Sequence, residues 1–170
     1  THQMYQLYRP SSHDATTFSL SRAIEDVVCL SQPAATKAGV AINWEPDREE
    51  IQVTLPEGEV KQILLNLMQN AIQASPEGSA VRLEVGAGDA TVSVAVIDQG
   101  EGIQPTDLPR IFDPFFTTKV GDSKQGMGLG LSVSRSLIEA MGGTIEVASQ
   151  PGAGAVFTAN FPVADPPGNR

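Results

Sequence analysis

An amphipathic helix near the middle of the chain places the strongest constraint on what it can fold into. Between about residue 57 and residue 74 the apolar residues recur at helical spacing, and the breaker cluster Ser75-Pro76-Glu77-Gly78 follows directly. These apolar residues cover a broad arc of the helix: Val60, Ile63, Leu64, Leu67, Met68, Ala71 and Ile72. An arc of this width is typical of a helix that packs against a second layer of structure.

The opposite face of this helix carries a strip of neutral amides, namely Gln62, Asn66, Gln69, Asn70 and Gln73. A solvated face is one explanation. Such faces normally use Glu and Lys, however, because Asn is a poorer helix former that competes for its own backbone. The strip therefore favours a ligand over bulk water. An Asn carbonyl suits a hard cation such as Mg²⁺, which takes its remaining ligands from waters and substrate phosphates.

Helical and alternating segments succeed one another along the rest of the chain. Phe18 and Leu20 open a helix-like stretch that Gly39 ends. Alternating valines and leucines at 81–85 and 92–96 predict a hairpin that turns at 86–89. Further strands are expected at 40–44, 51–55, 144–147 and 155–161, and a further helix at 131–141. This order predicts a two-layer α/β sandwich with a mixed, mostly antiparallel sheet.

Composition narrows the function classes. At 170 residues the chain is long enough for one domain with a sizeable core, and its net charge of −9 argues against a nucleic-acid partner. No apolar run approaches the roughly 20 residues of a membrane helix, and residues 1–4 lack a signal-peptide pattern. Cys29 is the only cysteine, which excludes an internal disulfide, and its apolar helical setting predicts a small core residue.

Two glycine-rich segments are candidate ligand contacts. Asp98-Gln-Gly-Glu-Gly102 follows a strand, and it could be a plain tight turn or an Asp that accepts a hydrogen bond from the amino group of a base. Gly126-Met-Gly-Leu-Gly130 precedes a helix, whose unpaired N–H groups stabilise an anion. The second segment is neither a dinucleotide fingerprint nor a Walker-A loop, and a flexible loop capping the helix remains the alternative.

Three of the chain's six phenylalanines lie between these segments, at positions 112, 115 and 116. They are either core residues or an anchor for a mobile lid formed by the Gly/Ser/Lys-rich residues 120–126. Lys119 and Lys124 are the only basic residues there, which makes them the natural phosphate contacts.

The order of these features resembles the catalytic and ATP-binding domain of sensor histidine kinases, a Bergerat-type α/β sandwich. The helix Gln62-Ile-Leu-Leu-Asn-Leu-Met-Gln-Asn-Ala71, Asp98-x-Gly-x-Gly102, the phenylalanines and Gly126-x-Gly-x-Gly-Leu131 match its N, G1, F and G2 boxes. Gly142-Gly-Thr-Ile-Glu146 and Gly152-x-Gly-Ala-x-Phe157 resemble its closing hairpin. The Phe-Phe-Thr-Thr-Lys segment resembles the corresponding segment in the nitrogen-regulator and oxygen-sensor branch of this family. The resemblance covers about residues 16–163. Residues 1–15 would be a linker or the end of a preceding hairpin, and residues 164–170 would be a disordered tail.

The resemblance implies ATP and Mg²⁺ as cofactors and assigns roles by position. Asn70 would be the principal Mg²⁺ ligand, Asn66 would support the phosphate and metal shell, and Lys119 would serve in place of the Arg that many members have after the phenylalanines. Asp98 would bind the adenine amino group. The full nucleotide-binding set would be Asn66, Asn70, Asp98, Gly100, Gly102, Ile103, Phe112, Thr118, Lys119, Gly126, Met127, Gly128, Leu129, Gly130 and Leu131.

The same fold occurs in hydrolysing relatives, the heat-shock chaperone, gyrase and mismatch-repair ATPases. They have a general-base Glu where this chain has Asn66, which cannot accept a proton near neutral pH. A kinase is therefore expected, with an ATP hydrolase or a non-catalytic ATP-binding regulatory module as alternatives.

A histidine kinase also needs a phosphoacceptor histidine on a dimerising helical hairpin. Only twelve residues precede His13, too few for two long helices, so neither His2 nor His13 is expected to be the acceptor. The resemblance implies a fragment that is monomeric alone and dimeric in its parent. Its partners would be the parent's dimerisation and phosphoacceptor domain and a downstream response regulator. A cytoplasmic location is expected for the fragment, and a membrane anchor elsewhere in the parent stays open.

Overall fold

The computed structural model describes residues 14–46, 49–116 and 130–163. Most of the predicted lead-in at 1–15 and all of the tail at 164–170 lie outside these ranges, as does the predicted lid at 120–126. Within the described ranges, no helix is both long enough and apolar enough to cross a membrane.

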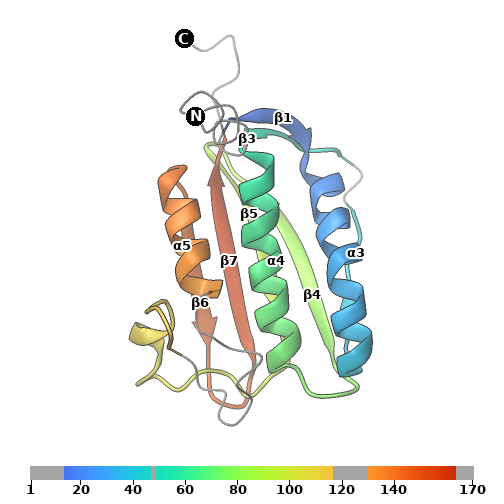
Figure 1. Cartoon of the computed structure of the whole chain (residues 1–170), viewed down its shortest axis with the longest axis vertical. Coiled ribbons are helices and arrows are strands. Elements are labelled where there is room, and N and C mark those ends of the chain that lie inside the picture. Colours follow the sequence, from blue (N-terminus) through green and yellow to red (C-terminus); the bar gives the residue numbers. More distant parts are fainter. Residues whose placement is uncertain (1–13, 47–48, 117–129, 164–170) are drawn as a thin grey trace, which may run out of the picture.

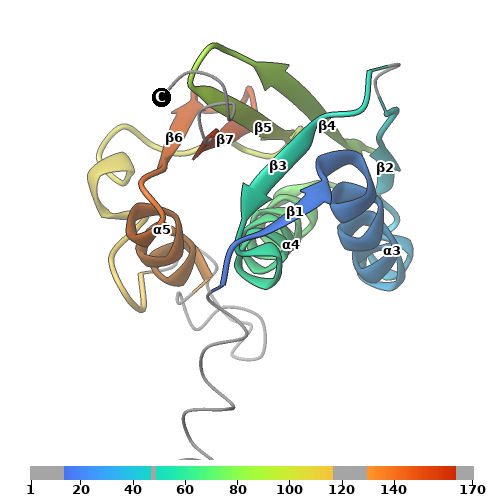
Figure 2. The same cartoon turned by 90° about the horizontal axis from the view of Figure 1, so that it is seen from above.

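Three helices and a five-stranded sheet form two layers (Figures 1 and 2). The α-helices of the described ranges are α3 (Leu20–Ala38), α4 (Glu57–Ala74) and α5 (Gly130–Ala140), and all three cover the same face of the sheet. A short 3-10 helix, η1 (Leu108–Arg110), lies between β5 and α5 in the sequence. The sheet has the order β2-β4-β5-β7-β6, built from β2 (Ala41–Asn43), β4 (Ala80–Ala87), β5 (Thr91–Ile97), β7 (Ala155–Pro162) and β6 (Thr144–Ser149). The predicted two-layer α/β class is confirmed.

The sheet is mixed and mostly antiparallel, as predicted. β2 pairs with β4 in parallel, whereas β4–β5, β5–β7 and β7–β6 are antiparallel. The β4–β5 hairpin turns later than the sequence suggested, because Gly86 and Ala87 still pair with Ser93 and Val92. A hydrogen bond of 2.8 Å from the Gly88 N–H to the Thr91 carbonyl closes the turn.

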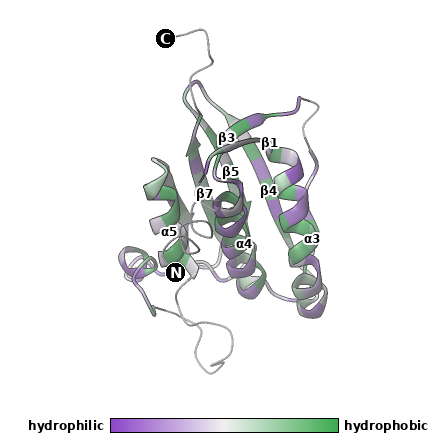
Figure 3. Cartoon of the chain, turned by 45° about the horizontal axis from the view of Figure 1, so that its top comes forward, coloured by the Kyte–Doolittle hydropathy of each residue, from purple (hydrophilic) through white to green (hydrophobic). Residues whose placement is uncertain are grey.

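Helix α4 lies at the centre of the helical layer, and its apolar arc forms much of the core. All seven apolar residues predicted for this arc are buried. They face a sheet whose inward positions include Val92, Val94 and Val96 of β5 and Phe157 and Phe161 of β7, all of them buried. Hydrophilic residues are visible along the outward sides of α3 and α4 (Figure 3). Burying the apolar face against the sheet is the main stabilising term for such a helix.

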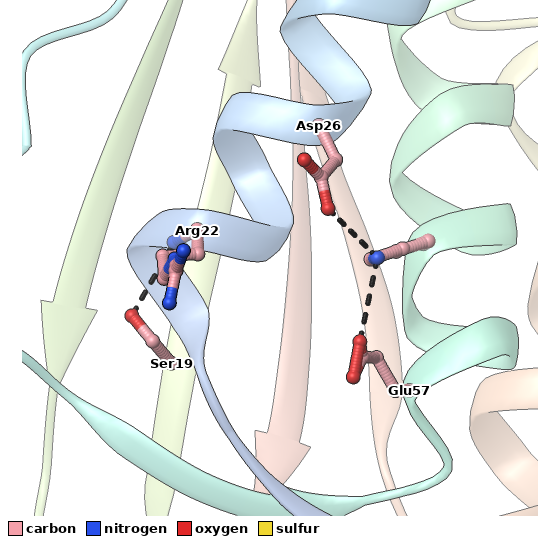
Figure 4. Close-up of polar contacts among 5 residues, drawn as sticks. Ser19, Arg22, Asp26 and Glu57 are labelled. Carbon is pink, nitrogen blue, oxygen red and sulfur yellow. Dashed lines mark hydrogen bonds and ion pairs between the residues drawn. The ribbon is translucent and has the colours of Figure 1, made fainter.

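Helix α3 begins later than predicted, because residues 16–19 form a strand. β1 (Thr16–Ser19) pairs antiparallel with β3 (Gln52–Leu55), so Phe18 lies opposite Val53 and outside the helix. The helix starts at Leu20, where the Ser19 side chain caps it by accepting a hydrogen bond of 3.3 Å from the Arg22 N–H (Figure 4). Its end at Gly39, in the left-handed conformation with φ of 69°, agrees with the prediction.

The prediction that Cys29 is a core residue is wrong, because its side chain is exposed. The buried stripe of α3 consists of Leu20, Ala23, Ile24, Val27, Ser31 and Ala35. Cys29 is two positions after Val27, about 200° around the helix, and therefore points away from the sheet.

An ion-pair cluster joins α3 to α4 near their first turns. The Lys61 ammonium lies 2.8 Å from an Asp26 carboxylate oxygen and 3.3 Å from a Glu57 carboxylate oxygen (Figure 4). The hydrogen bond to Asp26 is the largest cause that raises the pKa of Lys61 above its ordinary value, and Glu57 adds to it while partial burial opposes it. The cluster therefore links the two helices on their partly exposed side.

Candidate functional site

Several of the predicted site residues gather at one end of the molecule, the lower end in Figure 1. The C-terminal half of α4, the segment after β5, the β6–β7 turn and the first turn of α5 all lie there (Figure 1). Segments that are up to about 90 positions apart in the sequence thus come together in the fold.

Asp98 is buried at the end of β5, and its carboxylate is held by main-chain N–H groups. Its Oδ1 accepts hydrogen bonds of 2.9 Å from the Gly100 N–H and 3.2 Å from the Ala155 N–H. Burying a carboxylate is costly unless such donors compensate for the lost water. The position and orientation of this carboxylate are therefore fixed by the backbone on both sides of it.

The glycines after Asp98 permit two close backbone contacts. A Cβ on Gly100 would collide with the carbonyl oxygen of Ala74, the last residue of α4. Gly102 has a φ of 78°, and a Cβ there would collide with the carbonyl oxygen of Gln150 in the β6–β7 turn. The predicted glycine wall thus lies between the end of α4 and the β6–β7 turn, where a larger residue does not fit.

Ser149 ties the next residue of this segment to the same turn. The Ile103 N–H donates a 2.8 Å hydrogen bond to the Ser149 Oγ, which itself donates to the Gly154 carbonyl at 2.7 Å. Ile103, a predicted nucleotide contact, is half-buried and packs against the core. The segment from Asp98 to Ile103 is consequently held along its whole length.

Asn66 bonds to protein partners on two helices. Its Oδ1 accepts a 2.9 Å hydrogen bond from the Gln62 amide, and its Nδ2 donates to the Ser134 Oγ at 3.0 Å and to the Gly130 carbonyl at 3.3 Å. The structure therefore brings the predicted residues Asn66 and Gly130 into direct contact, across the boundary between α4 and α5.

Asn70, one helical turn further on, differs from Asn66. It is half-buried, and its side chain makes no hydrogen bond to any other residue in the described part of the chain. An amide oxygen in this setting fits the needs of Mg²⁺, which takes one or two oxygens from protein and the rest from phosphate and water. The residue type and its surroundings are thus compatible with the predicted metal role.

The three phenylalanines do not share one environment. Phe112 is half-buried with the Arg135 guanidinium 5.1 Å from its ring centre, and Phe116 is half-buried with Arg110 at 4.8 Å. Phe115 instead is 68% exposed and has a φ of 67°, a conformation that bulky residues rarely adopt. Two rings therefore anchor this segment, while the third is turned outward.

The remaining predicted contacts fall mostly outside the described residues. Thr118, Lys119, Lys124 and Gly126 to Leu129 belong to this group, so their roles stay predictions. Gly130 opens α5 and is exposed, and Leu131 is half-buried against the core.

Sequence reasoning missed three residues that hold the site together, namely Ser134, Ser149 and Ala155. Ser134 is fully buried one turn into α5, and a lone hydroxyl on the apolar face of a helix was the available signal. Ser149 and Ala155 flank the β6–β7 turn and act on Asp98 and Ile103 from some 45 to 60 residues away, so only the tertiary structure reveals them.

The comparisons with known proteins agree with this geometry. Residues 56–165 match the family described as "Histidine kinase-, DNA gyrase B-, and HSP90-like ATPase". The chain is 36% identical over 169 residues to the signal transduction histidine-protein kinase AtoS of Escherichia coli (strain K12). This match covers 99% of the chain but 27% of AtoS, so the chain spans about a quarter of that relative.

Solved structures give the same result at the level of the fold. The catalytic domain of histidine kinase ThkA superposes with a TM-score of 0.78 at 34% identity, covering 88% of this chain and 96% of that domain. Full-length ShkA in complex with AMPPNP gives a TM-score of 0.76 at 32% identity, over 88% of this chain and 31% of ShkA. The chain therefore belongs to the family of histidine kinase-, DNA gyrase B- and HSP90-like ATPases, and it has the α/β fold of a histidine kinase catalytic domain.

Proposed function

We propose that this chain binds Mg·ATP and presents the γ-phosphoryl group for transfer to a histidine on a separate dimerisation domain of a sensor kinase. The observation that carries this proposal is the buried Asp98 carboxylate, fixed by two main-chain N–H groups beside a glycine segment. A rigid, desolvated acceptor of this kind can recognise the amino group of a base with little reorganisation.

Adenine recognition is assigned to Asp98 and its glycine segment. The carboxylate accepts a hydrogen bond from the exocyclic amino group, which guanine lacks at that position. Gly100 and Gly102 keep the backbone close to α4 and to the β6–β7 turn, since neither position has room for a side chain. The surface that contacts the base is therefore shaped by the packing of three segments, namely residues 98–102, the end of α4 and the β6–β7 turn.

Phosphate and metal binding are assigned to the facing helices. Asn70 offers an amide oxygen to Mg²⁺, which when bound neutralises charge on the phosphate oxygens. Phosphate binding is also assigned to the first turn of α5, because the N-terminus of a helix carries the positive end of its dipole. Lys119 is proposed as the basic contact on the sequence pattern alone.

A kinase role fits the residue at position 66 better than hydrolysis does. Asn66 stands where the hydrolysing relatives carry a general-base Glu, and an amide cannot take a proton from water. The nucleophile is then an imidazole nitrogen of the acceptor domain, which forms the new bond to the γ-phosphorus as ADP leaves. A response regulator would receive the phosphoryl group afterwards.

Two linked measurements test this function. Calorimetric titration with ATP and Mg²⁺ should show binding by the chain, with Asp98→Asn weakened and Asp89→Asn, at an exposed turn position, unchanged. The acceptor hairpin of the parent kinase, added as a separate protein, should become phosphorylated on histidine in the presence of the chain and Mg·ATP.

Each outcome is informative. Absence of ATP binding by the wild-type chain contradicts the proposal as a whole. Binding without phosphohistidine formation on the parent's own hairpin contradicts the kinase role and favours a regulatory module. Rapid release of phosphate by the chain alone favours a hydrolase.

A further inference from the structure

The hydrogen bonds of Asn66 connect the amide strip of α4 to the first turn of α5. Its Nδ2 reaches the Ser134 Oγ at 3.0 Å and the Gly130 carbonyl at 3.3 Å. A main-chain carbonyl only accepts hydrogen bonds, so the amide nitrogen must face α5 and the oxygen must face Gln62. Both N–H groups of Asn66 are thus used by α5 and not by a ligand.

Ser134 is the buried end of this connection. It is completely inaccessible to solvent, and it lies one turn after Gly130 on the side of α5 that faces α4. A buried hydroxyl that loses its partner is costly, so the hydrogen bond to Asn66 favours a single placement of the two helices. The space at Gly130 supports the same fit, because a Cβ there would be 3.9 Å from the Asn66 Cβ, an ordinary packing distance.

We propose that Ser134 is a positioning residue for the phosphates of ATP and that Asn66 acts mainly through it. The pair sets the first turn of α5, to which phosphate binding is assigned, at a fixed place relative to Asn70 on the same strip of α4. This inference rests on the proposed ATP-binding function. In this inference Asn66 connects α4 to α5, and it does not contact the metal shell directly.

The test compares two serines on the same helix. Ser134→Ala removes the buried partner of Asn66, whereas Ser136→Ala changes an exposed serine two positions further along α5. Affinities for Mg·ATP and for AMP are measured on both variants and on the wild type. Ser134→Ala should weaken ATP binding about five- to tenfold, the effect of losing one hydrogen bond, and leave AMP binding within about twofold. Ser136→Ala should resemble the wild type for both nucleotides.

The ratio of ATP to AMP affinity separates positioning from general loosening of the fold. A merely structural defect would weaken both nucleotides together, because they share the base-binding segment. Ser134→Cys gives a second variant of similar volume with a poor acceptor, and it should show the same selective loss if Ser134→Ala fails to fold. An unchanged ratio in the folded variant contradicts the proposal.

A double-mutant cycle tests the route through which Asn66 acts. If Asn66 works through Ser134, adding Ser134→Ala to Asn66→Ala should cost little further ATP affinity. Additive losses would mean that Asn66 contacts the ligand independently, which overturns the proposal. A wild-type chain that binds no ATP contradicts the proposed function itself. A wild-type chain that binds ATP while Ser134→Ala behaves like Ser136→Ala contradicts only the present inference.

Discussion

Asp98 and Ala155 bond to each other twice. The Asp98 N–H donates to the Ala155 carbonyl at 2.9 Å, and the Ala155 N–H donates back to the Asp98 Oδ1 at 3.2 Å. One residue of the β6–β7 hairpin thus fixes both the backbone and the carboxylate of the residue to which adenine recognition is assigned. The nucleotide specificity of the chain should therefore depend mainly on this carboxylate.

We expect Asp98→Asn to lower ATP affinity about tenfold or more, because a hydrogen bond to an ionised group is worth about 1.5–3 kcal/mol. The side-chain shape is kept, so the fold should survive. The new amide can donate as well as accept, and the preference for ATP over GTP should shrink. Competition between the two nucleotides for a fluorescent analogue measures both effects. An Asp98→Asn variant with the wild-type preference would show that another residue reads the base.

Asn70→Ala should weaken ATP binding about tenfold in Mg²⁺, by removing one protein oxygen from the metal. In EDTA the same substitution should have little effect. Titrations under both conditions give the comparison, and Asn43→Ala on the exposed edge strand β2 serves as the matched control. Equal losses with and without Mg²⁺ would argue that Asn70 contacts the nucleotide rather than the metal.

Two glycines with similar backbone conformation should respond differently to alanine. Gly102 and Gly152 have φ of 78° and 81°, but only Gly102 lies against another backbone, that of Gln150. Gly152→Ala should cost about 1 kcal/mol in strain, while Gly102→Ala should cost about 3 kcal/mol and also weaken ATP binding. Urea unfolding and ATP titration of both variants provide the measurement. Equal costs would contradict the close approach at Gly102.

Lys61→Met should reduce the free energy of unfolding at neutral pH by about 1 kcal/mol or less, as expected for a partly exposed ion pair. Since folding raises the pKa of Lys61, its contribution is fully present below the ordinary lysine pKa of about 10.4 and is lost as the pH rises through the raised value. The difference between wild type and variant should therefore disappear at strongly alkaline pH.

Denaturant unfolding at several pH values checks this dependence, with Lys37→Met as a control. Lys37 is an exposed lysine without an ion pair in the residues that the structure describes. A difference for Lys61→Met that persists unchanged at alkaline pH would mean that packing of its aliphatic chain, rather than its charge, is responsible.

The sequence was most informative where the signal is local and repeated. The bounds predicted for α4 and its seven buried residues agree with the structure, because 18 residues give several periods of an apolar pattern before a breaker cluster ends it. The end of α3 at Gly39 was predictable for the same reason, since glycine favours the left-handed cap.

Short and non-local features were not predictable. β1 has four residues, too few to show a period, and it exists because β3 pairs with it from about 35 positions away. The error at Cys29 had another cause. Its neighbours in the sequence are apolar, but the helix places this position on the side that faces away from the sheet. The different hydrogen bonding of Asn66 and Asn70 was also hidden, because both have the same residue type on the same strip.

By itself, the sequence determined the two-layer class, the family and the order of the segments that carry the site, because these follow from local periodicity and from motif spacing. Only the tertiary structure decided which of the two asparagines bonds to α5 and which lacks a partner among the described residues. It also decided that the β6–β7 hairpin holds Asp98 in place. The physical reason is that a hydrogen bond depends on where its two groups lie in space, and a partner that is some 60 residues distant leaves no mark in the local sequence.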